Sequence, residues 1–289
     1  MDVLVTGAYG QCGTALYDHL DHDWTPLNRS DRPPDHPYGG FETYVADVAG
    51  YDAIRPAFDG QDAVVHMAAK SGEGPWGVIL ESNIVGTYNV LEAARQAEVQ
   101  TVVFGSTNHV VGRYEDEHAP DIYFPGHGVV VDADSPIRPD SRYGTSKAFG
   151  EALGRYYVEN FEYPKQFYAL RIGNVSFPEY DHPYAWPEQR IADGEYERGS
   201  REHAEHVGRM KGMWHSRPDF AHEVECCLRD GGVEFGVFGA VSDNGRRWLS
   251  IEGARARIGY DPQDDGEEWD GPPDGWSPPE GEAPTRRGG

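Results

Sequence analysis

Short apolar runs alternate with longer amphipathic stretches over the first two thirds of the chain. The runs at residues 2–7, 24–28, 44–47, 63–69, 101–106 and 167–174 have the length and composition of strands in a buried sheet. The stretches between them predict helices that end near Leu20 and Phe58, and helices over residues 76–98 and 146–159. Strands that alternate with helices predict an α/β fold, a Rossmann-type doubly wound parallel sheet.

The pattern loosens after Ser176. Residues 179–205 are rich in Pro, Tyr, His and charge and predict a loop or lid, which a helix over 219–228 and a strand over 233–240 follow. From residue 261 onward, Pro, Gly and acidic residues predominate, which is typical of a disordered or loosely attached tail. We therefore expect a Rossmann domain over 1–175, a small C-terminal lobe over 176–260 and a tail over 261–289.

Three glycines stand at the turn between the first strand and the first helix. Gly7, Gly10 and Gly13 lie in the run GAYGQCG. A pyrophosphate at a helix N-terminus needs backbone N–H groups close at hand, and glycine allows that approach. The spacing GxxGxxG differs from the commoner GxGxxG, so a plain structural turn is the alternative. We expect a dinucleotide phosphate site at this turn.

The residues after the second strand would meet the adenosine ribose in such a fold. An acidic residue there bonds the ribose hydroxyls and repels a 2′-phosphate. This chain has Asn28, Arg29 and Ser30 instead. The neutral residue removes the repulsion and the arginine offers a planar donor to a phosphate, which predicts NADP as the preferred cofactor, with NAD still used. Alternatively, Arg29 is a solvated loop residue and Asp31 is a displaced ribose ligand.

A tyrosine stands four positions before one of only four lysines in the chain, in the run SRYGTSKAFGE. Tyr143 and Lys147 would share one face of a helix. A phenol has a pKa near ~10 and becomes a base at neutral pH only where a cation stabilises its phenolate. The pair is therefore either a coincidence of spacing or an activated tyrosine.

Several motifs occur together in a recognisable order: the glycine turn, ADV at 46–48, HMAA at 66–69, GSTNHVVG at 105–112, the Tyr/Lys pair and RIGN at 171–174. As a set they resemble the extended short-chain dehydrogenases/reductases. The runs STNHVVG and RPDSRYGTSKAFGE are most similar to uronate dehydrogenases and to haloarchaeal sugar 1-dehydrogenases, which include L-arabinose 1-dehydrogenases and NAD-dependent glucose-6-phosphate dehydrogenases. The run SDNGRRWLSIEGARARIGYDPQD is similar to the same group.

The resemblance implies a dinucleotide-binding first domain, a substrate-binding lobe and specific roles for single residues. The catalytic residues would be Thr107, Tyr143 and Lys147, where Lys147 bonds the nicotinamide ribose, the Tyr143 phenolate takes the substrate's hydroxyl proton and Thr107 holds the reacting oxygen. The cofactor-binding residues would be Gly7, Tyr9, Gly10, Gln11, Cys12, Gly13, Asn28, Arg29, Ser30, Asp47, Val48, Met67, Ala68, Ala69, Lys70, Asn83, Gly105, Ser106, Tyr143, Lys147, Ile172 and Gly173. The sugar-binding residues would be Ser71, Thr107, Asn108, His109, Tyr143 and Asn174.

The segment after RIGN departs from the uronate dehydrogenase pattern. Those enzymes carry an arginine-rich, PRDRR-like stretch that meets the sugar carboxylate, whereas this chain has FPEYDHPY. Arg190, Arg198 and Arg201 lie nearby, although solvated side chains are the simpler interpretation. We therefore expect an NAD(P)-dependent aldose 1-dehydrogenase, an oxidoreductase that converts the anomeric hydroxyl of a neutral sugar such as L-arabinose to the lactone.

Other functions stay open at this point. The alternatives are glucose-6-phosphate or uronate oxidation, a nucleotide-sugar epimerase or dehydratase, and an NADP sensor without catalysis. His203 and His206 have the spacing of metal ligands but no third ligand, so we expect no metal site. The resemblance also implies a homodimer or a dimer of dimers, formed through the helices over 76–98 and 143–160.

Acidic residues outnumber basic ones, with 49 Asp and Glu against 25 Lys and Arg and a net charge of −24. This balance argues against nucleic acid or an anionic membrane as a partner. Its self-repulsion is best tolerated in strong salt, which predicts a halophilic, salt-rich cytoplasm. Three sparse cysteines (Cys12, Cys226 and Cys227) and an N-terminus that enters a strand pattern directly favour a reducing compartment and no signal peptide.

We expect the fold and the activity to require molar salt. The Debye length falls to about 3 Å at 1 M salt, which screens the repulsion between surface carboxylates. Thermal unfolding followed by circular dichroism should therefore give a higher midpoint in about 2 M KCl than in dilute buffer. Equal midpoints in the two conditions would contradict a halophilic adaptation.

Overall fold

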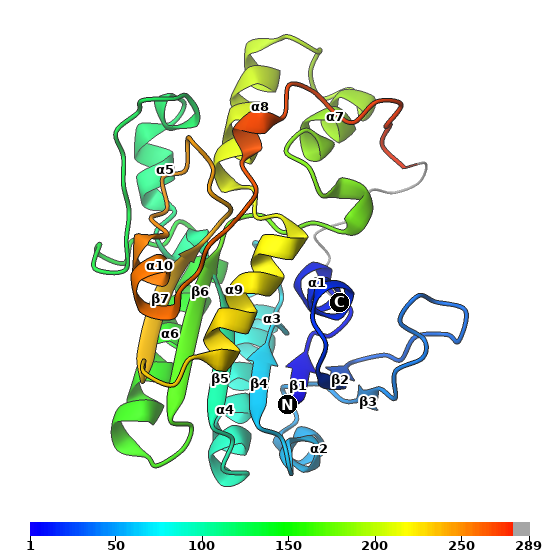
Figure 1. Cartoon of the computed structure of the whole chain (residues 1–289), viewed down its shortest axis with the longest axis vertical. Coiled ribbons are helices and arrows are strands. Elements are labelled where there is room, and N and C mark those ends of the chain that lie inside the picture. The colour runs from blue at the N-terminus through cyan, green and yellow to red at the C-terminus, as the bar shows by residue number, and fades with distance from the viewer. Residues whose placement is uncertain (280–289) are drawn as a thin grey trace.

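The computed structural model describes residues 1–279, and a seven-stranded parallel sheet forms its centre (Figure 1). The spatial order is β3-β2-β1-β4-β5-β6-β7, so the direction of winding reverses between β1 and β4. The strands are β1 (Asp2–Thr6), β2 (Asp23–Asn28), β3 (Tyr44–Val45), β4 (Ala63–His66), β5 (Thr101–Thr107), β6 (Gln166–Ile172) and β7 (Phe235–Ala240). This arrangement confirms the predicted Rossmann-type fold class.

Helices cover both faces of the sheet. They are α1 (Gln11–His19), α2 (Tyr51–Ile54), α3 (Trp76–Ile79), α4 (Gly86–Gln96), α5 (Arg113–His118), α6 (Arg142–Asn160), α7 (Ala185–Ala192), α8 (Arg201–Met213), α9 (Arg217–Arg229) and α10 (Glu252–Ile258). The helix predicted over 76–98 consists of α3, a π-helical turn η2 (Leu80–Val85) and α4. Within residues 1–279, none of the helices is long and apolar enough to span a membrane.

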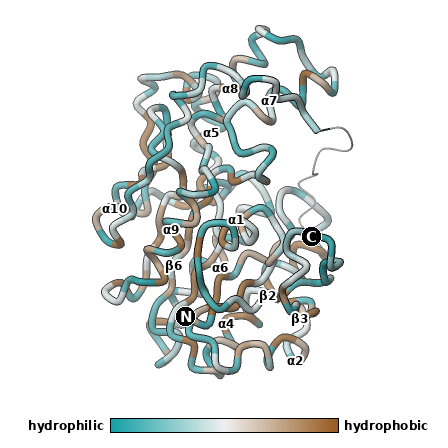
Figure 2. Tube along the Cα trace, turned by 45° about the vertical axis from the view of Figure 1, so that its right-hand side comes forward, coloured by the Kyte–Doolittle hydropathy of each residue, from teal (hydrophilic) through white to brown (hydrophobic). Residues whose placement is uncertain are grey.

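Two apolar cores lie on the two faces of the sheet. Val3 and Val5 of β1 pack into one core with residues of α1 and α9, while Leu4 packs into the other with residues of α4 and α6. Side chains alternate between the faces along a strand, so a sheet covered on both sides needs apolar residues at successive positions. Figure 2 shows the resulting contrast: hydrophobic stretches follow β6 and α6, and hydrophilic stretches prevail along α7 and α8.

Helix α6 packs directly on the aromatic rings of the sheet because two of its residues lack a side chain. A Cβ on Gly150 would come within 2.3 Å of the Phe104 ring of β5, and a Cβ on Gly154 within 2.2 Å of the Phe167 ring of β6. The two rings stack on each other with centroids 5.8 Å apart. The packing therefore determines how far α6 stands from the carboxyl ends of β5 and β6.

The loop or lid predicted over 179–205 is wrong for two parts of that segment. Helix α7 occupies Ala185–Ala192, and α8 begins at Arg201, where the Ser200 hydroxyl accepts from the His203 N–H. Both helices are short of aliphatic residues, so the apolar periodicity that marks a helix is weak. They pack instead through aromatic rings and close glycine contacts. Tyr180 stacks on Trp186 with ring centroids 4.9 Å apart.

The structure places residues 261–279, part of the tail predicted to be disordered or loosely attached, in contact with the rest of the molecule. Residues 261–279 run across the lobe formed by α7 and α8, with a 3-10 turn η6 at Gly266–Glu268 (Figure 1, red). Asp219 accepts hydrogen bonds from the backbone of Gln263 and Asp264, and Trp269 stacks on His182. The composition is poor in aliphatic residues, but tryptophans and backbone donors anchor the segment. Residues 280–289 lie outside the described part, and the division into domains stays a prediction.

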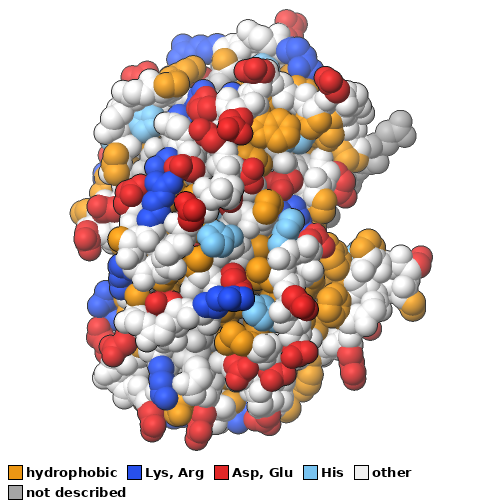
Figure 3. Space-filling view, viewed as in Figure 1, with side chains coloured by type: hydrophobic (Ala, Val, Ile, Leu, Met, Phe, Trp, Pro, Cys, Tyr) orange, Lys and Arg blue, Asp and Glu red, His pale blue; other side chains and the backbone are white. Residues whose placement is uncertain are grey.

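Charged side chains cover the surface of the molecule. Figure 3 shows Asp and Glu spread over the visible face among fewer Lys and Arg. Many of the arginines are paired with carboxylates, as Arg138 is with Glu117 and Arg155 is with Glu159. Exposed pairs of this kind contribute about 0–1 kcal/mol each, so they do not offset a net charge of −24.

Candidate functional site

The glycine turn between β1 and α1 has the backbone geometry that a bound pyrophosphate needs. Gly7 has a φ of +68°, a left-handed conformation, and a Cβ there would lie 2.7 Å from the Ala68 nitrogen. Gly13 lets α1 pack closely on the turn itself, because a Cβ would lie 2.3 Å from the Ala8 carbonyl oxygen. The nine-residue helix α1 then begins at Gln11 with its N–H groups at the carboxyl edge of the sheet. A dinucleotide therefore fits this cradle.

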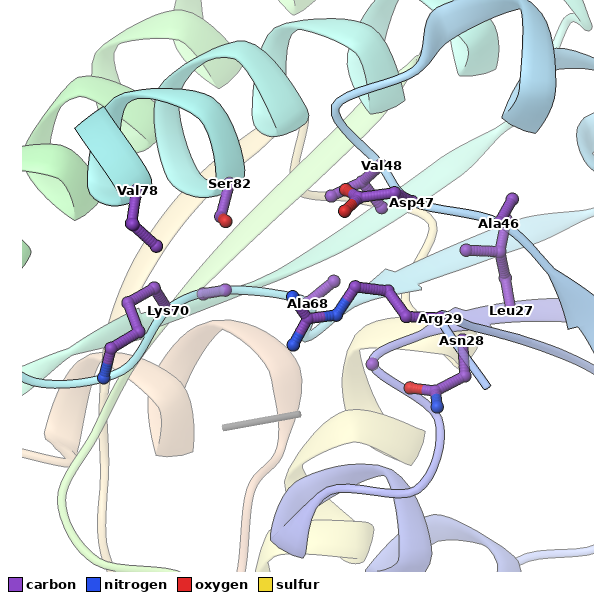
Figure 4. A pocket seen from close by; sticks show the side chains of 12 residues that line it. Leu27, Asn28, Arg29, Ala46, Asp47, Val48, Ala68, Lys70, Val78 and Ser82 are labelled. Carbon is purple, nitrogen blue, oxygen red and sulfur yellow. The ribbon is translucent and has the colours of Figure 1, made fainter. Parts of the chain in front are cut away.

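A cavity of about 460 Å³, partly open to solvent, adjoins the turn at the ends of β2 and β3; we call it the nucleoside pocket (Figure 4). Its lining consists of Gly7, Leu27, Asn28, Arg29, Ala46, Asp47, Val48, Ala68, Ala69, Lys70, Val78 and Ser82. In Figure 4, Arg29 extends across the pocket beneath Asp47 and Val48. The structure thus brings together eight of the predicted cofactor residues (Gly7, Asn28, Arg29, Asp47, Val48, Ala68, Ala69 and Lys70).

Contacts at the rim of the nucleoside pocket show which of the two loop arginines, Arg29 or Arg32, lines the pocket. The Asn28 amide donates to the Ser30 carbonyl oxygen over 2.9 Å. Arg32 lies 4.7 Å from the centroid of the Tyr9 ring, which engages it outside the pocket. Asp31 accepts from the Thr43 hydroxyl and from the Arg32 backbone N–H. Arg29 is therefore the loop arginine that lines the pocket.

A second cavity lies beside the first, at the carboxyl ends of β4, β5 and β6; we call it the substrate pocket. It holds about 840 Å³, partly open to solvent. The residues around it are Gln11, Cys12, Met67, Ser71, Gly72, Gly105, Ser106, Thr107, Asn108, His109, Tyr143, Ile172, Gly173, Asn174, Val175, Arg209 and Met213. All six predicted sugar-binding residues are in this set.

Tyr143 and Thr107 face the substrate pocket, and Lys147 lies behind them. The Ser141 hydroxyl accepts from the Gly144 N–H and starts α6, so Tyr143 stands in the first turn of the helix. Lys147 is 3% exposed, and its Nζ lies 4.6 Å from the Phe104 ring centroid and 6.0 Å from the Tyr143 ring centroid. Burial lowers the pKa of Lys147 to about 7. Hydrogen bonds to a ribose would offset part of the cost of keeping this group charged.

Two buried side chains of the substrate pocket are oriented by each other. The Thr107 hydroxyl donates to Asn108 Oδ1 over 3.3 Å and accepts from the His109 N–H. This contact leaves Asn108 Nδ2 buried and without a hydrogen bond to any residue in 1–279. A buried donor of that kind is costly unless a ligand accepts from it. Asn108 is therefore suited to bind an oxygen of a substrate.

His109 is held by a carboxylate. Its Nδ1 lies 2.6 Å from Asp140 Oδ2, and its ring meets the Tyr143 ring edge-on with centroids 5.9 Å apart. Burial raises the pKa of Asp140, but hydrogen bonds from His109 and Ser141 bring it below its ordinary value. Asp140 is thus an anion that fixes the imidazole at the edge of the pocket.

Six of the predicted residues line neither pocket. Gly10 and Gly13 shape the turn, Ser30 accepts from Asn28, and the Tyr9 hydroxyl bonds Thr43. Lys147 lies beneath the substrate pocket. Asn83, in the π-helical turn, donates to Ser146 Oγ and to the Lys70 carbonyl and accepts from the Lys70 N–H, so it joins the Lys70 loop to α6. Such π turns are often found at functional sites.

Arg209 is a pocket residue that sequence reasoning missed. It comes from α8 and lines the substrate pocket, while the Glu115 carboxylate accepts from its guanidinium and from the Tyr123 hydroxyl. The predicted stand-ins Arg190, Arg198 and Arg201 are instead exposed and paired with Glu195, Glu188 and Glu205. The position of Arg209 is not evident from the sequence, because α7 and half of α8 lie between β6 and the point where the chain returns to the pocket.

The two histidines with metal-ligand spacing have other partners. His206 Nδ1 lies 2.7 Å from the Tyr196 hydroxyl, and His203 Nε2 lies 3.8 Å from Glu188. Among residues 1–279 there is no group of three or more His, Cys, Asp or Glu that could hold a metal ion.

Comparisons with known proteins agree with this geometry. An NAD-dependent glucose-6-phosphate dehydrogenase of Haloferax volcanii is 38% identical, covering 92% of this chain and 95% of the relative. An L-arabinose 1-dehydrogenase (NAD(P)(+)) of the same organism is 35% identical, covering 91% and 96%. The crystal structure of uronate dehydrogenase from Agrobacterium tumefaciens superposes with a TM-score of 0.70 at 28% identity, covering 92% of this chain and 86% of that chain. The NAD dependent epimerase/dehydratase family matches residues 3–192, and the chain belongs to this family of extended short-chain dehydrogenases/reductases.

Proposed function

We propose that this protein is an NAD(P)-dependent sugar 1-dehydrogenase that oxidises an anomeric hydroxyl to a lactone. The observation that carries the proposal is the substrate pocket, which Thr107 and Tyr143 both line in front of the buried Lys147, next to a nucleoside pocket. Two relatives that match more than nine tenths of this chain are named as sugar dehydrogenases, which supports the same class of reaction for this protein.

In the proposed reaction, Tyr143 is the general base. Its phenolate takes the proton of the anomeric hydroxyl, and the ammonium group of Lys147 stabilises the phenolate. Thr107 donates to the reacting oxygen and holds it beside Tyr143. When bound, the dinucleotide accepts the hydride from the anomeric carbon. Asn108 and His109 bind the remaining hydroxyls and orient the sugar ring in the pocket.

Arg209 bears on the class of sugar. The sequence predicted a neutral sugar because no arginine follows RIGN, but Arg209 brings a guanidinium to the substrate pocket. We therefore propose an aldose with an anionic group, a sugar phosphate or a uronate, as the first candidate substrate. A neutral aldose such as L-arabinose is the second candidate, because Glu115 neutralises part of the charge of Arg209.

A sugar panel with an Arg209 variant tests this assignment. We expect Arg209→Met, made together with Glu115→Gln so that no buried carboxylate is left unpaired, to raise the KM for the anionic sugar by roughly 10–100-fold. Glucose 6-phosphate, glucuronate and L-arabinose, assayed by nicotinamide absorbance in molar KCl, give the comparison. Arg190→Met is the control, since Arg190 is paired with Glu195 on the surface. A wild type that oxidises only the neutral sugar would contradict the anionic class.

We expect Tyr143→Phe to lower turnover by about 10²–10⁴-fold, since the substitution keeps the ring but removes the ionisable oxygen. Dinucleotide binding, followed by fluorescence titration, should be largely preserved. Tyr163→Phe, which lies beyond the end of the same helix and keeps its ring contact with Lys165, is the matched control. Near-normal turnover in Tyr143→Phe would exclude Tyr143 as the base.

We propose that NADP is preferred over NAD. Asn28 carries no charge to repel a 2′-phosphate, and Arg29 in the nucleoside pocket can donate to it. One such contact favours NADP by roughly 10–100-fold, and molar salt reduces this preference. Asn28→Asp should raise the ratio of kcat/KM for NAD to that for NADP.

The control for the Asn28→Asp variant is Asp31→Asn, measured in the same cofactor assay. Asp31→Asn should change the NAD/NADP ratio by no more than about twofold, because Asp31 is engaged by Thr43 and by the Arg32 backbone rather than by the pocket. A large change in this variant would identify Asp31 as the displaced ribose ligand. A wild type that already prefers NAD would show that Arg29 does not bind a phosphate.

We further propose assembly into a homodimer or a dimer of dimers. Helices α3, η2, α4 and α6 expose large apolar side chains, namely Trp76, Val78, Leu80, Val85, Tyr88 and Tyr156. Exposed apolar groups on two neighbouring helices favour burial against a second copy of the chain.

A further inference from the structure

Residues 261–276, here called the strap, cross the outer side of the lobe that carries Arg209 (Figure 1). The first anchor of the strap is the start of α9. Asp219 accepts from the Gln263 and Asp264 N–H groups over 2.8 and 3.1 Å, and the Ser216 hydroxyl donates to Asp264 Oδ2 over 2.5 Å. The strap is therefore hydrogen-bonded to the start of α9 before it reaches α8.

The second anchor is the last turn of α8. Gly266 lies so close that a Cβ would stand 2.5 Å from the Lys211 carbonyl oxygen. The Gly266 N–H donates to Asn244 Oδ1, and the amide of Asn244 donates to the Gly212 carbonyl. Glu267 pairs with Arg246 and lies 3.8 Å from Lys211 Nζ. The strap thus contacts the backbone of this turn directly and through Asn244.

The third anchor is the tryptophan that follows the turn. Trp269 meets the Trp214 ring edge-on with centroids 6.0 Å apart and stacks on His182 at 5.4 Å. Trp214 forms a β-bridge with Asn174, whose N–H donates to the Met213 carbonyl over 2.7 Å. Trp269 therefore packs on Trp214, whose backbone is paired with that of Asn174, a predicted sugar-binding residue.

The opposite side of the same part of α8 faces the substrate pocket. Arg209 and Met213 line the substrate pocket, and so does Asn174. The strap and the pocket consequently share one turn of helix between them. A displacement of about 1 Å at a positioned binding group is enough to change rates by as much as 100-fold, so the support behind this turn matters for binding.

We propose that the strap is a positioning element of the substrate pocket, which sets the affinity for the sugar by holding the α8 turn and Asn174 in place. This role rests on the proposed sugar 1-dehydrogenase function. The nucleoside pocket, in contrast, is lined by residues between Gly7 and Ser82. We therefore expect the strap to affect the affinity for the sugar more than the affinity for the dinucleotide, whose adenosine half would lie in the nucleoside pocket.

Three full-length variants test the strap, all measured in molar KCl. Trp269→Ala should raise the KM for the sugar about tenfold, while the dinucleotide Kd stays within about twofold of the wild type. Trp276→Ala is the matched control. It removes the same side chain further along the strap, where its Nε1 donates to the Glu179 carbonyl and its ring contacts Tyr180 and His182. Because Trp269 shares the His182 contact and adds the contact with Trp214, both constants should stay within about twofold in the control if the Trp214 contact positions the pocket. Glu267→Gln weakens the second anchor and should raise the KM alone.

The outcomes separate the strap from the proposed function. A folded Trp269→Ala with an unchanged KM, or with equal losses in KM and Kd, overturns the positioning role even if its Tm is lower. If Trp269→Ala does not fold, Glu267→Gln decides by the same criteria. A wild type that binds the dinucleotide but neither binds nor oxidises any aldose, by calorimetry and absorbance, overturns the proposed function and the strap's role with it.

Discussion

The buried ion pair between Glu151 and Arg171 joins β6 to the two elements that carry the proposed catalytic residues, α6 and β5. Glu151 stands one turn after Lys147 on α6, Arg171 belongs to β6, and the Ser106 hydroxyl of β5 donates to the same carboxylate over 2.6 Å. Both charged side chains are about 3% exposed. Removing one partner of such a pair costs about 3–5 kcal/mol, because the other charge stays buried alone. With the glycine contacts of α6, this network fixes α6, which carries Tyr143, against β5, which carries Thr107.

The distribution of charge adds a second constraint. The chain carries a net charge of −24, yet its proposed cofactor is also an anion. Two of the four lysines, Lys70 and Lys147, lie at the site, and Arg29 and Arg209 line its two pockets. The buried Arg217 donates to the Gln11 carbonyl and to Thr14 at the start of α1. Cations are thus concentrated where an anion must enter, and the acidic surface elsewhere repels anions from other approaches.

The features that the sequence could predict are those that depend on residues close together in the chain. The glycine turn, the Tyr143/Lys147 spacing and the apolar strands are local patterns, and the structure shows the turn, helix and strands where they were predicted. Arg209 could not be found in this way, because its place in the pocket depends on α7 and α8, whose contacts are aromatic rings and glycines rather than an aliphatic stripe. The strap was missed for a related reason. The strap contains few apolar residues, but two tryptophans and a few backbone N–H groups are sufficient to anchor it.

The two halves of the site therefore differ in how they are built. The nucleoside pocket comes from residues 7–82, close in sequence, whereas the substrate pocket combines Gln11, Tyr143, Asn174 and Arg209 with support from residues beyond 260. A change in α8 or in the strap can alter the shape and charge of the substrate pocket without touching β1, α1 or β2. Relatives that match more than nine tenths of this chain are named for different sugars, glucose 6-phosphate and L-arabinose. The contacts proposed for the sugar are therefore largely separate from those proposed for the adenosine end of the dinucleotide, because they come from different segments of the chain.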